Sequence, residues 1–135
     1  MSFGFYVKVY LASLVGFFII DKFWLGLVAR AFYRKHLGFL LSTSPNWVAA
    51  TLFYLLFVVG VVVFVVVPAL RSGSFHNALL KGALFGLIAY ATYDLTNLAT
   101  VKDWPLIVTV IDLVWGTFLS TVVSASGYLA GMAMR

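Results

Sequence analysis

Residues 56–67 read Leu-Phe-Val-Val-Gly-Val-Val-Val-Phe-Val-Val-Val, and Pro68 follows them. In a water-soluble protein such a β-branched run is typical of a buried strand. In a lipid bilayer an unpaired strand would leave its backbone N–H and C=O groups without hydrogen-bond partners, whereas a helix satisfies them internally. The structure of this stretch therefore depends on its surroundings, and the composition of the whole chain indicates what those are.

The chain has 135 residues, of which 64% are hydrophobic and 10% are charged. Soluble domains average about 45–50% apolar and about 25% charged residues, so this excess of apolar surface must face lipid. The formal net charge of +5 comes from scattered bases, and there is no cysteine for a disulfide or a thiolate metal site. We expect one membrane domain whose partners include membrane lipids and exclude nucleic acid.

Four segments reach the about 20 apolar residues that a membrane-spanning helix needs. They cover roughly residues 5–28, 46–70, 76–99 and 106–131. The connections at 71–74 and 100–105 are short, which predicts antiparallel neighbours. We therefore predict an all-α integral membrane bundle of four transmembrane helices, with residues 1–135 as a single domain.

The first segment has some features of a signal peptide, since Lys8 precedes the apolar residues Leu11–Ile20. However, Asp21 and Trp24 would lie in the cleavage region, where small neutral residues are required. We expect this segment to be the first membrane helix. Residues 30–45 after it mix bases with apolar residues, which predicts a short amphipathic segment at the membrane interface.

The orientation of the bundle is weakly determined, because each side of the membrane receives four bases. One side holds Lys8, Arg71, Lys81 and Arg135, and the other holds Arg30, Arg34, Lys35 and Lys102. The cluster in the first connection favours a cytoplasmic position for that connection.

Three of the four acidic residues, Asp21, Asp94 and Asp112, lie inside the apolar segments, and there is no glutamate. A carboxylate at the bilayer centre costs about 2.5–3.5 kcal/mol on insertion scales, and such a residue indicates a functional site by default. Counting 1.5 Å per residue from the segment ends places all three about 8–12 Å deep in the same half of the bilayer. Tyr54 of the second segment falls at the same depth.

Helical periodicity adds aromatic and amide side chains to these carboxyl groups, because residues three or four apart share a face. The predicted ligand- or proton-binding residues are Asp21, Trp24, Tyr54, Tyr90, Tyr93, Asp94, Asn97, Asp112 and Trp115. Lys22 and Arg30 are candidate ion-pair partners for the carboxyl groups, because long side chains reach along a helix. With the polar faces turned inward, the valine-rich second helix should face mostly lipid.

The pattern Ile-Asp-x-x-Trp occurs twice, at residues 20–24 and 111–115. The two copies lie in helices that run in opposite directions in a four-helix bundle. Inverted repeats of this kind occur in transporters, although a match this short also arises by chance.

Structural and metal-binding roles remain open for the three aspartates. Hydrogen bonds between membrane helices average about 0.6 kcal/mol, which is a weak reason to bury three carboxyl groups. Asp21, Asp94 and Asp112 supply the oxygen ligands that Mg²⁺ or Ca²⁺ prefers, whereas His36 and His76 lie near opposite ends of the second helix and predict no joint site.

Two glycine pairs, Gly82/Gly86 and Gly127/Gly131, have the four-residue spacing that lets helices approach closely. They predict tight packing, and they are candidate contacts with a second copy or with a membrane partner protein.

No nucleophile–base pair, phosphate-binding loop or zinc-binding HExxH pattern occurs, which argues against an enzyme, and no cofactor is indicated. We therefore expect a protein that binds or translocates a small cation, a proton or a polar-headed ligand. The alternatives are an enzyme or enzyme subunit in lipid modification and a structural subunit of a membrane complex.

The stretch Tyr-Ala-Thr-Tyr-Asp-Leu-Thr-Asn-Leu-Ala-Thr at residues 90–100 resembles an uncharacterised bacterial family of small membrane proteins with a domain of unknown function. Phe53-Tyr54, residues 67–70 and Asp112 with Trp115-Gly116 extend the resemblance over nearly the whole chain. It implies a multi-pass protein of the bacterial inner membrane with about four helices. Members tend to accompany genes for fatty-acyl modification and for light or oxidative stress, which implies a lipid-related role and transfers no catalytic residue.

Three carboxyl groups in one apolar layer cannot all stay ionised without a cation, because burial and nearby like charges both favour the neutral form. We predict that at least one of them is protonated at neutral pH. Infrared titration of the carboxyl C=O stretch tests this, and three ionised carboxylates at about pH 6 would contradict it.

Overall fold

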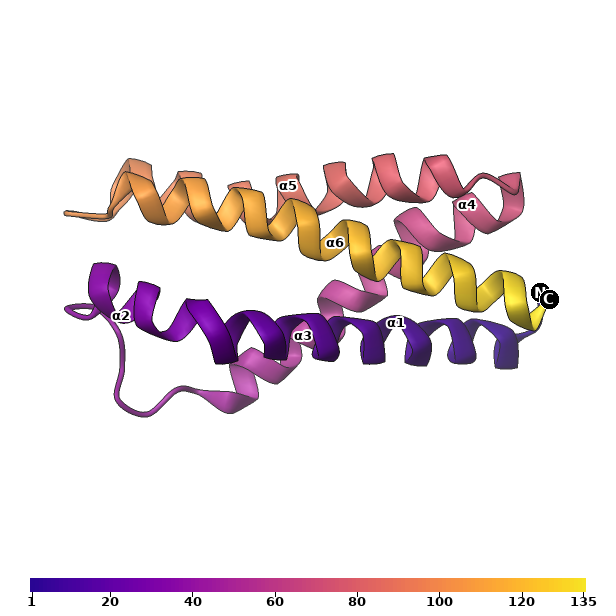
Figure 1. Ribbon diagram of the computed structural model, residues 1–135, viewed down its shortest axis with the longest axis horizontal. Coiled ribbons are helices and arrows are strands. Elements are labelled where there is room, and N and C mark those ends of the chain that lie inside the picture. The colour runs from indigo at the N-terminus through magenta and orange to yellow at the C-terminus, as the bar shows by residue number, and fades with distance from the viewer.

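The computed structural model describes all 135 residues, which form helices and no strand. The helices in chain order are α1 (Phe3–Trp24), the π-helical turn η1 (Leu25–Ala29), α2 (Arg30–Leu37), α3 (Trp47–Val61), the π-helical turn η2 (Val62–Val66), α4 (Val67–Ser72), α5 (Phe75–Thr100) and α6 (Leu106–Met134). Four continuous helices result, and each is long and apolar enough to cross a membrane. The predicted all-α bundle of four membrane helices is confirmed (Figure 1).

Local hydrogen bonds define where the helices begin and end. The side chains of Ser2, Asn46 and Ser74 accept bonds of 3.2, 3.1 and 3.1 Å from backbone N–H groups in the first turns of α1, α3 and α5. Gly73 ends α4 with φ 67°, a left-handed conformation that glycine adopts without strain. Both chain ends lie at the same end of the bundle, as four crossings require (Figure 1).

The first helix is longer than the sequence indicates. It runs without a break from Phe3 to Leu37, 35 residues in all, or about 52 Å at 1.5 Å per residue. The basic residues after position 29 continue this helix instead of forming a separate element, because residues 30–37 contain no proline or glycine. Arg34 and Lys35 lie in its last turn, where positive charge complements the helix dipole.

The second membrane helix, α3–η2–α4, supplies much of the core, so the prediction that it faces mostly lipid is wrong. Val58, Val61, Val66 and Leu70 are fully buried. The carboxyl groups meet in one half of the bundle only, and in the other half the core is built mainly from these valines packed against α1 and α6. The opposite face of this helix, with Leu56 as an example, remains exposed.

α5 and α6 form the closest helix pair, and glycine makes their approach possible. A Cβ atom on Gly86 would lie 2.5 Å from Ser120 Cβ and closer still to the Gly116 carbonyl oxygen. A Cβ atom on Gly82 would lie 2.5 Å from Ser124 Oγ. The tight packing predicted for this pair is confirmed, and the partner helix is α6 of the same chain.

Gly127 and Gly131 on α6 pack against two other helices of the same chain. A Cβ atom on Gly127 would meet Ser13 of α1 and Val66 of η2, and one on Gly131 would lie 2.7 Å from Leu70 Cδ1. Both glycine pairs therefore hold the bundle together internally.

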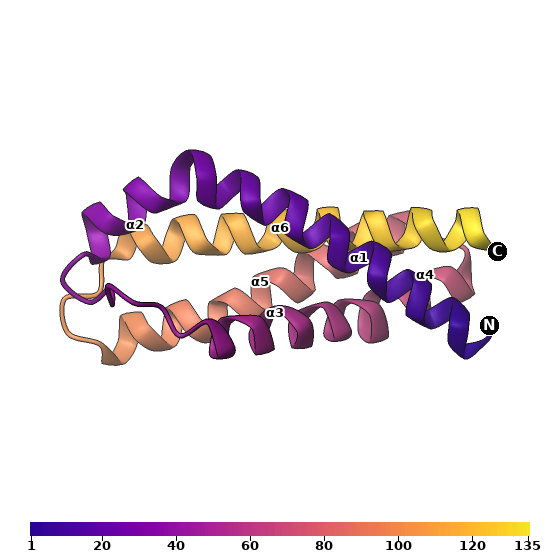
Figure 2. The same ribbon diagram turned by 90° about the horizontal axis from the view of Figure 1, so that it is seen from below.

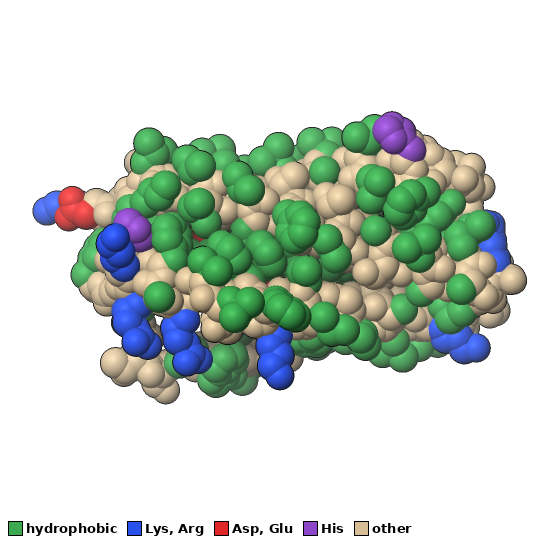
Figure 3. All heavy atoms as spheres, in the orientation of Figure 1, with side chains coloured by type: hydrophobic (Ala, Val, Ile, Leu, Met, Phe, Trp, Pro, Cys, Tyr) green, Lys and Arg blue, Asp and Glu red, His purple; other side chains and the backbone are tan.

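The helices are arranged as a four-cornered bundle (Figures 1 and 2). The second membrane helix contacts α5 mainly through η2, away from the end where α3 begins. Hydrophobic side chains cover the middle of the surface, and most lysine and arginine side chains gather towards the two ends (Figure 3). This distribution suits a bilayer with an apolar centre and charged headgroups.

Replacement of Gly86 by alanine tests the close α5–α6 contact. Because the new Cβ meets backbone and cannot be accommodated by a rotamer change, we expect Gly86→Ala to lower the free energy of unfolding by about 1–3 kcal/mol. Reversible unfolding by sodium dodecyl sulfate in mixed micelles measures this quantity. The matched control is Gly26→Ala, since nothing lies within 4 Å of its Cβ position, and alanine there should be neutral or slightly stabilising. Equal effects of the two substitutions would contradict the packing.

Candidate functional site

A cavity of about 450 Å³ lies between all four membrane helices, in the half of the bundle where α3 begins. Its lining residues are Asp21, Trp24, Leu25, Tyr33, Phe53, Tyr54, Ala89, Tyr90, Tyr93, Asp112 and Trp115. Most of this wall is apolar or aromatic, and its charged groups are two carboxyl groups. Apolar pockets with a few convergent polar groups are the usual form of ligand sites.

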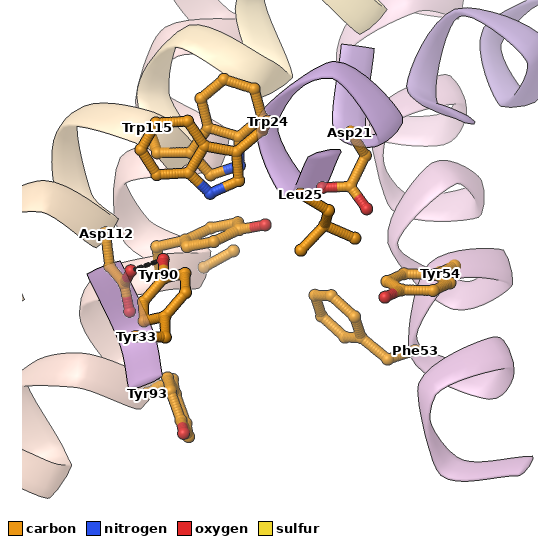
Figure 4. A pocket seen from close by; sticks show the side chains of 11 residues that line it. Asp21, Trp24, Leu25, Tyr33, Phe53, Tyr54, Tyr90, Tyr93, Asp112 and Trp115 are labelled. Carbon is orange, nitrogen blue, oxygen red and sulfur yellow. Dashed lines mark hydrogen bonds between the residues drawn. The ribbon is translucent and has the colours of Figure 1, made fainter. Parts of the chain in front are cut away.

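The two carboxyl groups approach the cavity from different helices. Asp21 extends from α1 on one side and Asp112 extends from α6 on the other, with the Trp24 and Trp115 rings between them (Figure 4). Asp112 is 6% exposed and Asp21 is half-buried. A positively charged or hydrogen-bond-donating group in the cavity would meet acceptors on both sides.

Trp24 and Trp115 stack on each other, with ring centroids 4.5 Å apart and an interplanar angle of 11°. They are the tryptophans of the two Ile-Asp-x-x-Trp copies, which lie on the antiparallel helices α1 and α6. The antiparallel direction places each aspartate on the opposite side of the stacked pair (Figure 4). The sequence echo thus corresponds to a local two-fold arrangement at the site.

Asp94 does not line the cavity. It is 0% exposed, on the α5 face that packs against α6. Thr109 Oγ1 lies 3.4 Å from the Asp94 backbone oxygen, and Asp112 is one turn further along the same face of α6. The Asp94 and Asp112 carboxyl groups are close enough for a hydrogen bond when one of them carries a proton. Neither carboxyl oxygen of Asp94 has another donor within the chain.

Tyr33 completes the site, although it is not among the residues predicted for it from the sequence. Its hydroxyl donates a hydrogen bond to Asp112 Oδ1. The apolar pattern predicts that the first helix ends near residue 28, whereas the helix continues through η1 into α2. A π-helical turn holds one extra residue, which rotates the following helix by about 100°. The turn therefore decides which face of α2 meets the cavity, and that face carries Tyr33.

No positive side chain of the chain neutralises the three carboxyl groups. The polar neighbours of Asp94 and Asp112 are each other's carboxyl group and, for Asp112, the Tyr33 hydroxyl. Asp21 has no charged neighbour that compensates its carboxyl group. Lys22 and Arg30, the predicted candidate partners, are exposed and pair with none of them.

The three aspartates do not meet as one metal site. No three His, Cys, Asp or Glu side chains come close enough together to hold a metal ion. Asp94 lies behind the cavity wall and Asp21 lies across the cavity from Asp112, so the carboxyl oxygens that Mg²⁺ or Ca²⁺ would need are dispersed.

Seven of the nine predicted site residues line the cavity, and two do not. Asp94 is buried behind the wall, and Asn97 is half-buried one turn further along α5. Four lining residues are not among those predicted from the sequence, namely Leu25, Tyr33, Phe53 and Ala89. Tyr33 reaches the cavity because the first helix extends beyond residue 28.

The cavity wall reaches the outer surface of the bundle within the apolar zone. Leu25, Phe53 and Tyr93 line the cavity and are 44%, 46% and 58% exposed. These residues come from η1, α3 and α5, so the opening lies on the side of the bundle where α3 stands apart from α5. In a membrane this side faces acyl chains.

The chain belongs to the family described as "Predicted membrane protein (DUF2177)", whose family model matches residues 6–129. No curated protein and no solved structure matches the chain.

Removal of one hydroxyl tests the bond between α2 and α6. We expect Tyr33→Phe to lower the free energy of unfolding by about 1–2 kcal/mol, because it leaves a buried carboxyl group without its donor. Unfolding in mixed micelles measures the change. Tyr54→Phe is the control, since its hydroxyl also lies at the cavity but makes no hydrogen bond within the chain. A loss for Tyr54→Phe as large as that for Tyr33→Phe would contradict the assignment.

Proposed function

We propose that this member of the DUF2177 family binds a membrane-soluble amphiphile, with the polar head between Asp21 and Asp112 and the apolar tail directed into the lipid. The observation that supports this most strongly is the pair of carboxyl groups, without a cation of the chain, on opposite walls of an aromatic cavity that opens sideways. The head favoured by such a site carries a positive charge or hydrogen-bond donors.

The aromatic wall supports a cationic head in particular. Trp24, Trp115, Tyr90 and three further aromatic rings surround the space between the carboxyl groups, with Tyr33 beside Asp112. A cation over the face of an aromatic ring gains about 0.5–2 kcal/mol, most when it is desolvated. A carboxylate head would instead meet two acceptors and would be repelled.

The sideways opening supports an amphiphile over a water-soluble ligand. Leu25 and Phe53 at the opening are apolar, and a tail that leaves between them stays in contact with acyl chains. A ligand with this form partitions into the bilayer and reaches the site without crossing water.

The competing functions fit the geometry less well. A purely structural subunit requires no central cavity with carboxyl groups on its wall. Lipid chemistry is compatible with the opening, but the wall offers only carboxyl and phenol groups for it and no histidine, serine, cysteine or lysine. Translocation of a ligand would require the same binding site together with a second route by which the ligand leaves it. We propose a location in a bacterial inner membrane, which the resemblance of residues 90–100 implies.

A series of amphiphiles with one tail and different heads tests the proposal. We expect dodecylammonium to raise the melting temperature of the wild-type protein in nonionic detergent by about 2–5 °C near saturation. Dodecanol should raise it less, and dodecanoate should not raise it. Asp21→Asn and Asp112→Asn should reduce the ammonium shift.

Asp103→Asn is the matched control, because Asp103 lies in the connection between α5 and α6 and is exposed. Its backbone φ of 61° suits asparagine as well as aspartate. Equal shifts for all three heads, or an unchanged ammonium shift in both cavity variants, would refute the proposal.

A further inference from the structure

Asp112 belongs to two environments at once. One side of its carboxyl group contributes to the cavity wall, and the other side meets Asp94, which is sealed between α5 and α6. Asp112 therefore connects a site that a ligand can enter with a carboxyl group that no ligand reaches directly.

Two ionised carboxylates cannot be stable at this contact without compensation. Each charge removed from water costs several kcal/mol, and removal of a second like charge next to it costs more. A buried polar group without a hydrogen-bond partner adds a further penalty. If Asp94 and Asp112 were both ionised, both carboxylate oxygens of Asp94 would lack a hydrogen-bond donor, because a carboxylate only accepts hydrogen bonds.

A single proton removes both difficulties. With one proton, one carboxyl group donates a hydrogen bond to the other, the pair carries one negative charge instead of two, and the Tyr33 hydroxyl stabilises the charge on Asp112. The titratable groups that face the pair are Tyr33 from α2 and Tyr90 and Tyr93 from α5. Asp21 lies beyond Tyr90, and no cation is among these groups.

We propose that the Asp94–Asp112 pair holds one proton when the cavity is empty and releases it to water when a cationic head binds beside Asp112. This rests on the proposed binding of an amphiphile. The positive charge of the head then balances the second negative charge of the pair, as the proton did before. The O–H bond breaks and the proton leaves, so the net charge of the site is unchanged. The site then exchanges a cation for a proton.

The coupling is measured as protons released per bound ligand. Calorimetric titrations with dodecyltrimethylammonium, whose charge does not depend on pH, are made at neutral pH in two buffers with different ionisation enthalpies. We expect the wild type to release about one proton per ligand. Asp94→Asn should bind the same ligand and release almost none, because the amide donates a permanent hydrogen bond to Asp112 and has no proton to lose.

Infrared spectroscopy separates failure of the proton site from failure of ligand binding. We expect a protonated carboxyl band in Asp21→Asn without ligand and its loss in the double variant with Asp94→Asn. Absence of this band, or ligand binding by the wild type without proton release, would overturn the exchange and leave amphiphile binding intact. Absence of any ligand binding by the wild type, with the band present, would overturn the proposed function, and the exchange that depends on it.

Discussion

The buried carboxyl groups at the α5–α6 contact impose the main constraint on this bundle. Asp94 is sealed from solvent without a cation, so its neighbours must supply hydrogen bonds and its charge must be limited. Asp112 can meet the first requirement, and the hydrogen bond that Tyr33 donates to Asp112 ties α2 to α6. The glycine contact brings α5 close enough to α6 for the two carboxyl groups to meet, and the cavity begins on the other side of Asp112.

The fold follows from the sequence to a large extent, because the bilayer allows few solutions. Apolar length gives the number of helices, short connections give their antiparallel order, and Gly82 with Gly86 indicates a close contact. The three aspartates at one depth locate the site in the correct half of the bundle. These features depend on composition and on helical periodicity, and both can be read from a single sequence.

The remaining features depend on tertiary contacts that periodicity does not contain. The expectation that polar faces turn inward places the valine-rich helix against lipid, yet Val61 and Val66 fill the core in the half of the bundle that holds no carboxyl group. The end of the first helix was placed too early, since bases and aromatic residues after Val28 resemble an interfacial segment. That error hid Tyr33, whose position depends on the π-helical turn. The distinction between Asp112 at the cavity and Asp94 behind it also requires the packed structure.

Photo-crosslinking tests most directly whether the cavity holds a cationic head. The probe is a dodecyl-chain quaternary ammonium that carries a diazirine beside the nitrogen, and labelled residues are mapped by mass spectrometry. We predict labelling at Trp24, Tyr90 and Trp115, reduced by excess dodecyltrimethylammonium and by Asp112→Asn. Labelling confined to the outer groove formed by Leu87, Val114 and Phe118, or labelling of the cavity that neither competitor nor substitution reduces, would contradict it.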